Sequence, residues 1–168
     1  MARKVKCAVT GEIGTSDTFI KIGSHYYKNQ AVYDADQKNK QSYRQLVEYI
    51  CYEFLGYGDG QPFPSSLPKF IKKLSYYDND VILETFKSCS DVIHWCLRNN
   101  EFSSEYGKLS YIFRIVENKI ADVHKNVLLR QKQERETKRV MVESEDLMDL
   151  GTKKRGKDIS NFLDDEDL

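Results

Sequence analysis

A long stretch in which apolar residues recur at alternating steps of three and four restricts the fold of this chain most. The stretch covers residues 106–127 and has the a/d pattern of about three helical heptads. Further apolar side chains at positions 111, 112 and 115 widen the stripe beyond a two-stranded seam. The pattern therefore predicts a long helix packed along a bundle, with a coiled-coil dimer as the alternative. The recurring residues are Tyr106, Leu109, Phe113, Val116, Ile120, Val123 and Val127.

Shorter helices are predicted upstream of this stretch. Apolar residues recur at helical spacing over residues 43–55, 67–74 and 82–97. Residues 56–64 are rich in Gly and Pro, which indicates a loop between the first two of these helices. Another short helix is expected at about residues 29–40. The chain is thus expected to be mainly α, with a helical bundle as its largest part.

Residues 4–28 have the pattern of a small β unit. Val5, Cys7 and Val9 alternate with other residues, as the side chains of a half-buried strand do. Farther along, Gly23-Ser24 separates two β-prone runs, which is a hairpin signal. We therefore expect a β-hairpin unit in front of the helices.

Charged residues are balanced overall but segregated toward the C-terminus. The chain has 26 Lys and Arg against 26 Asp and Glu. Basic stretches at residues 132–139 and 153–157 alternate with acidic stretches at 143–149 and 164–167. Blocks of one sign without apolar periodicity indicate a solvated tail. We divide the chain into a hairpin unit at residues 1–40, a helical domain at 41–139 and a charged, disordered tail at 140–168.

The hairpin unit carries a partial metal-ligand pattern. The runs concerned are Lys6–Gly11 and Phe19–Lys28. Together with the helix that follows, they resemble a zinc knuckle of the treble-clef type. The resemblance places the first ligand pair at Cys7 and Thr10. It places the second pair near Lys28 and Ala31. Cys7 is the one competent ligand among these four, and His25 is the other candidate nearby, whereas a structural zinc site needs four ligands. We therefore expect a degenerate, metal-free unit without a cofactor, in which Cys7 is a buried apolar residue.

The sequence lacks a recognisable catalytic motif. It has no phosphate-binding loop, dinucleotide fingerprint or nucleophile elbow. Cys51, Cys89 and Cys96 lie on or beside apolar stripes, which is typical of core thiols in a reducing compartment. No secretory signal or membrane-spanning apolar run is seen, so we expect a cytoplasmic protein (in the host cytoplasm if phage-encoded) without a membrane partner. We expect no enzymatic activity; a small enzyme of an unrecognised type is the alternative.

A cluster of lysines and tyrosines offers a possible nucleic-acid-binding surface. Lysines could contact phosphates and tyrosines could stack on bases, although a solvated face of a core helix has the same composition. A helix-turn-helix over residues 64–86 is disfavoured, because Asp78, Asp80 and Glu84 would open its second helix and repel phosphates. The candidate nucleic-acid-binding residues are Lys69, Lys72, Lys73, Tyr76 and Tyr77, and farther along the chain Lys132, Arg135, Lys138 and Arg139.

The C-terminal end places apolar residues beside clustered acid. This composition resembles the acidic C-terminal tips of single-strand DNA-binding proteins, which recruit replication partners. Apolar side chains would fill a groove on a partner while carboxylates meet its basic rim, and the alternative is a solubilising tail. The candidate partner-binding residues are Ile159, Phe162, Leu163, Asp164, Asp165, Glu166 and Asp167.

Taken as a whole, the chain resembles small accessory proteins of phages that infect Gram-positive bacteria, or of related mobile elements. The features that carry the resemblance are the knuckle-like start, the Leu67–Leu74 helix, the Leu109–Val123 helix and the acidic end. The resemblance implies a non-enzymatic accessory protein that binds and modulates a host or phage protein of DNA metabolism or defence. Direct nucleic-acid binding, in replication or transcription, is the alternative. We assign no oligomeric state.

Overall fold

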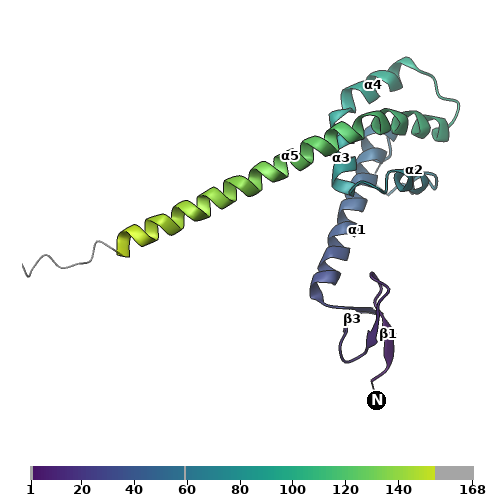
Figure 1. Cartoon of the computed structure of the whole chain (residues 1–168). Coiled ribbons are helices and arrows are strands. Elements are labelled where there is room, and N and C mark those ends of the chain that lie inside the picture. The colour runs from purple at the N-terminus through teal and green to yellow at the C-terminus, as the bar shows by residue number, and fades with distance from the viewer. Residues whose placement is uncertain (1, 59, 154–168) are drawn as a thin grey trace, which may run out of the picture. The chain divides into compact units, whose positions relative to one another are not determined.

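The computed structural model describes the backbone of residues 2–58 and 60–153, and the side chains of these residues as far as Met141 (Figure 1). The described chain is mainly α, with small antiparallel hairpins at its N-terminus, and this confirms the predicted fold class. Two compact units are distinguished, Met1–His124 and Lys125–Leu168, and each is described by itself. Among the described residues, no helix has both the length and the apolar character needed to span a membrane.

Two short hairpins form the hairpin unit at the N-terminus. Strands β1 (Lys4–Lys6) and β2 (Ile13–Thr15) pair with each other, as do β3 (Ile20–Ile22) and β4 (His25–Tyr27). A bridge between Cys7 and Tyr26 joins the hairpins, and the Ala8 N–H donates to the Tyr26 carbonyl at 2.9 Å. The second hairpin turns at Gly23 as predicted, whereas β2 was not predicted.

The sequence pattern does not predict strand β2, because a glycine stands at its centre. Glycine weakens a strand signal and normally marks a bulge or a close approach. Here the approach is close: a Cβ on Gly14 would lie 2.4 Å from the Phe19 ring. Any larger residue at this position would push Phe19 away from the strand.

Helix α1 (Gln30–Ile50) is a single element where two helices were predicted. Its N-terminus is capped by Asn29, whose Oδ1 accepts a hydrogen bond from the Val32 N–H at 2.9 Å. Residues 28–55 contain neither Gly nor Pro, so nothing ends the helix near residue 40. It continues into the π-helical segment η1 (Cys51–Leu55), which ends at Gly56 with a φ of 73°. The helix therefore crosses the position at which the sequence pattern divides the hairpin unit from the helical domain.

Three short helices follow, α2 (Leu67–Lys73), α3 (Asn79–Ser88) and α4 (Ser90–Asn99). The last two were predicted as one helix. They are separated at Cys89, whose φ of −99° and ψ of 2° depart from helical values. The Ser88 hydroxyl donates to the Thr85 carbonyl at 2.9 Å, and such local hydroxyl bonds compete with the helical ladder.

Helix α5 (Glu105–Lys153) carries the apolar pattern from which the bundle was predicted. The Ser104 Oγ accepts a hydrogen bond from the Gly107 N–H at 3.1 Å and caps the N-terminus of the helix. The helix continues past Leu129, where the apolar pattern stops. Residues 130–150 lack Gly and Pro and are rich in Glu, Lys and Arg, and these residues favour a helix even without a core-facing stripe.

The glycine-rich loop after η1 is tied to the start of α5. The Tyr57 hydroxyl donates to the Glu105 carboxylate, and this bond raises the pKa of Tyr57 to about 12. The Gln61 Oε1 also accepts the Gly58 N–H at 3.0 Å, which closes the loop on itself.

Four phenylalanines from four elements form the centre of the core. Phe54 of η1 lies 5.9 Å from Phe86 of α3, measured between ring centroids. Phe86 lies 5.3 Å from Phe113 of α5, edge to face, and Phe113 stacks on Phe70 of α2 at 5.2 Å. All four rings are 3% exposed or less. We call these residues the phenylalanine chain.

The phenylalanine chain yields a stability prediction. Phe86→Ala should lower the free energy of unfolding by about 3–5 kcal/mol, because it removes apolar contacts and leaves a cavity between three elements. Urea denaturation followed by circular dichroism measures the change. Tyr76→Ala is the control: this ring is 86% exposed, so the loss should be within about 0.5 kcal/mol. Equal losses for the two variants would contradict the assignment of Phe86 to the core.

Candidate functional site

Helix α2 separates an apolar side from a basic side. Its apolar residues Leu67, Phe70 and Ile71 are buried in the core, together with Leu74 just beyond its end. Because helical neighbours recur every three to four residues, the remaining positions are brought together on the outside. We call the exposed set Lys69, Lys72, Lys73 and Tyr76 the lysine–tyrosine face.

The lysine–tyrosine face has a surplus of positive charge. None of its three lysines forms an ion pair with a carboxylate within the part of the chain that the structure describes. The Lys73 Nζ lies 5.1 Å from the centroid of the Phe70 ring, which leaves its other side open to water. These ammonium groups can therefore meet an incoming anion without first breaking a salt bridge.

Tyr77 anchors the end of this face. Its ring meets Tyr76 edge to face at 5.3 Å and His124 edge to face at 5.2 Å. Tyr77 is half-buried, whereas Tyr76 projects into solvent. The structure thus gathers all five candidate residues of the 69–77 cluster at α2 and the turn that follows it.

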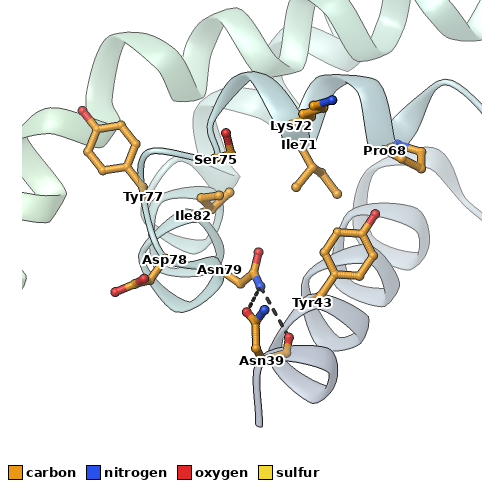
Figure 2. Close-up of a pocket in the computed structure, with 10 residues that line it drawn as sticks. All are labelled: Asn39, Tyr43, Pro68, Ile71, Lys72, Ser75, Tyr77, Asp78, Asn79 and Ile82. Carbon is orange, nitrogen blue, oxygen red and sulfur yellow. Dashed lines mark hydrogen bonds between the residues drawn. The ribbon is translucent and has the colours of Figure 1, made fainter. Parts of the chain in front are cut away.

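A pocket of about 340 Å³ opens beside the lysine–tyrosine face, between α1, α2 and α3 (Figure 2). Ile71 and Ile82 are 5% and 1% exposed and form its apolar wall, and the Tyr43 ring stands across from them. On the remaining side, the Asn79 Nδ2 donates to the Asn39 Oδ1 at 2.9 Å. The lining residues are Asn39, Tyr43, Pro68, Ile71, Lys72, Ser75, Tyr77, Asp78, Asn79 and Ile82.

Sequence reasoning missed most of this pocket. Tyr43 was assigned to an apolar stripe, but it is 36% exposed and turns toward the opening. Neither Asn79 nor Asn39 is among the candidate residues that the sequence pattern predicts. The two asparagines are in contact because α3 packs against α1, and the sequence around either residue does not predict that contact.

The second basic group lies on α5. Lys132, Arg135, Lys138 and Arg139 are all exposed, and Lys132 approaches the Glu136 carboxylate at 4.0 Å. These residues belong to the unit Lys125–Leu168, whereas α2 belongs to Met1–His124. The two basic groups are therefore treated as separate candidate surfaces.

The partner-binding candidates of the tail lie outside the described residues. They are Ile159, Phe162, Leu163, Asp164, Asp165, Glu166 and Asp167.

A hydrogen-bonded sulfur forms the centre of the hairpin unit. Cys7 is 2% exposed. Hydrogen bonding from the Thr10 side chain, and from the backbone at Thr10, Val9 and Lys28, lowers the pKa of Cys7 from 9.0 to about 7 against the opposing effect of burial. Lys28 in turn pairs with Glu12 at 2.9 Å, which raises the pKa of the lysine.

Three of the positions to which the zinc-knuckle resemblance points therefore meet at one sulfur. Around Cys7, positions 10 and 28 contribute O–H and N–H donors in place of thiolate ligands. Ala31 and His25 are exposed. No cluster of three or more His, Cys, Asp or Glu side chains with metal-site geometry occurs among the described residues.

Thr10→Val should raise the pKa of Cys7 above 7, because the variant keeps the shape of the side chain and removes the strongest donor to the sulfur. The ultraviolet absorbance of the thiolate, followed against pH, measures the change, and Cys7→Ala identifies the signal. A pKa lower in the folded than in the unfolded state stabilises the fold above the unfolded value near 9, and this contribution is lost as the pH falls through about 7. The variant should weaken that pH dependence. An unchanged thiolate titration would contradict the hydrogen-bonding scheme.

Comparison with known proteins matches the chain to a family model. The family model of the SPbeta prophage protein YorH matches residues 7–164, which is most of the chain. No curated protein and no solved structure matches it. The match supports the predicted resemblance to accessory proteins of phages of Gram-positive bacteria, while the zinc-knuckle likeness of the hairpin unit stays a resemblance. The chain belongs to the family of the SPbeta prophage protein YorH.

Proposed function

We propose that this prophage protein is a non-enzymatic accessory protein of phage DNA metabolism or defence, and that its folded body binds single-stranded nucleic acid. The lysine–tyrosine face is the observation that carries the proposal. It combines three lysines without carboxylate partners among the described residues and a tyrosine ring that is 86% exposed.

Single-stranded nucleic acid fits this face better than a duplex does. A strand with accessible bases offers phosphates to ammonium groups and aromatic faces to a tyrosine at the same time. A duplex entering along the α2–α3 turn would bring phosphates toward Asp78 and Asp80 at the start of α3. The exposed basic side chains Lys132, Arg135, Lys138 and Arg139 on α5 form a second, separate candidate surface for phosphates.

Replacing the three lysines tests the proposal. The triple variant Lys69→Gln, Lys72→Gln and Lys73→Gln should bind a labelled single strand more weakly. The plot of log affinity against log salt should also become shallower by about two, because each phosphate contact on a single strand contributes about −0.7 to its slope. Fluorescence anisotropy at several salt concentrations gives both values.

The matched control removes the same charge from other exposed lysines of the same unit. Lys4→Gln, Lys87→Gln and Lys119→Gln lie on β1, α3 and α5, outside the helix that carries the lysine–tyrosine face. Equal losses of affinity in the two triple variants would point to net charge alone and contradict a defined binding face.

Docking of a host or phage protein through the tail is the second candidate function. The sequence favours it because Ile159, Phe162 and Leu163 stand beside the acidic residues 164–167. Apolar anchors flanked by carboxylates suit a groove with a basic rim. The two functions are compatible, since a body that holds a strand could bring the tail's partner to it.

The double variant Phe162→Ala and Leu163→Ala should abolish capture of a protein partner from host lysate and leave the melting temperature unchanged. The reason is that these side chains would be buried in the partner and not in the folded body. Affinity capture with mass spectrometry and a thermal melt provide the two readouts. A lowered melting temperature would show that the tail packs on the body, and undiminished capture would exclude these two anchors.

A further inference from the structure

We propose that the pocket between α1, α2 and α3 receives one unpaired nucleobase of the strand held by the lysine–tyrosine face. This inference rests on the proposed function and adds that the protein recognises a base of the bound strand. The pocket and the face are continuous, because Lys72 belongs to both and Tyr77 lines the pocket at the end of the face.

The size and walls of the pocket suit a flat aromatic ring. Its volume of about 340 Å³ is at the lower end of the range of about 300–1,000 Å³ that is typical of small-ligand sites. Figure 2 shows the Tyr43 ring on one side and Ile71 and Ile82 turned into the same space. An aromatic face opposite aliphatic side chains can enclose the two faces of a base, since every base has a π-face that stacks on tyrosine.

The asparagine pair supplies a polar edge. The hydrogen bond from Asn79 Nδ2 to Asn39 Oδ1 holds the two amides against each other. Within the described residues, Asn79 Oδ1 and Asn39 Nδ2 have no hydrogen-bond partner, so one acceptor and one donor remain for a ligand. Bases present neighbouring donors and acceptors on their edges, and amide side chains are among the groups that pair with them.

Charge places the phosphate of the bound nucleotide at one end of the pocket. Lys72 stands at the rim on α2, and Lys69 and Lys73 lie on the same helix. Asp78 lies at the other end, where α3 begins, and would repel a phosphate there. The sugar–phosphate backbone should therefore run along α2, with the base pointing toward α1.

Binding of strands with and without bases tests the inference. The probes are labelled homopolymers of dA and of dT, about ten nucleotides long, and an abasic strand of equal length. Wild-type protein should bind the base-containing strands more tightly than the abasic strand. Tyr43→Leu should weaken binding to the base-containing strands by roughly 5- to 100-fold and leave binding to the abasic strand unchanged.

Two further variants serve as a control for the loss of an exposed tyrosine and as a test of the polar edge formed by the asparagine pair. Tyr52→Leu removes another exposed tyrosine, on η1, that does not line the pocket, and it should leave all affinities unchanged. Asn79→Ala should alter the ratio of dA to dT affinities while the melting temperature stays close to that of the wild type. This variant keeps the test decisive if Tyr43→Leu proves unstable.

The outcomes separate this inference from the proposed function. Salt-sensitive binding that is equal for abasic and base-containing strands, and unaffected by Tyr43→Leu, would overturn the base pocket and leave the proposed function standing. Failure to bind any strand at low salt would overturn both. Saturation by free dAMP at the same concentration as the dA strand would overturn the assignment to a strand base and make a free nucleotide the ligand.

Discussion

The contacts among Phe54, Phe86, Phe113 and Phe70 hold the helical part together. Each ring comes from a different element, so η1, α3, α5 and α2 are joined by three aromatic contacts in series. Aromatic pairs at these separations contribute packing energy beyond the area that they bury. The short helix α2 depends on this arrangement most, because seven residues are too few to form a stable helix alone.

The candidate binding surface is a consequence of that packing. Docking of Phe70 against Phe113 fixes the rotation of α2, and this rotation turns the three lysines outward. The same docking sets Ile71 and Lys72 beside α1 and α3, where the pocket forms. The helical spacing of α2 therefore sets both its buried residues and its exposed residues. A substitution of Phe70 would alter the packing of the core and the position of the lysines.

Features indicated by apolar spacing or by a capping residue could be predicted from the sequence, and features that depend on particular side-chain contacts could not. The stripe from Leu109 to Ile120 and the cap at Ser104 are local, and the structure contains both. The division at Cys89 and the strand around Gly14 depend on a local hydroxyl bond and on a neighbouring ring, so spacing alone did not reveal them. The pocket depends on Asn39 lying beside Asn79, and residue spacing does not predict that contact. The lysine cluster could be predicted, because its residues lie within one helical segment.

The bond between Tyr57 and Glu105 has a consequence for behaviour in strong alkali. In the unfolded chain the phenol ionises near pH 10, whereas in the folded chain it keeps its proton until about pH 12. The bond therefore favours the folded state fully below pH 10 and loses its effect as the pH rises through 12. Above that range two negative charges would face each other where the loop meets α5. Release of the glycine-rich segment is then expected to precede melting of the aromatic core.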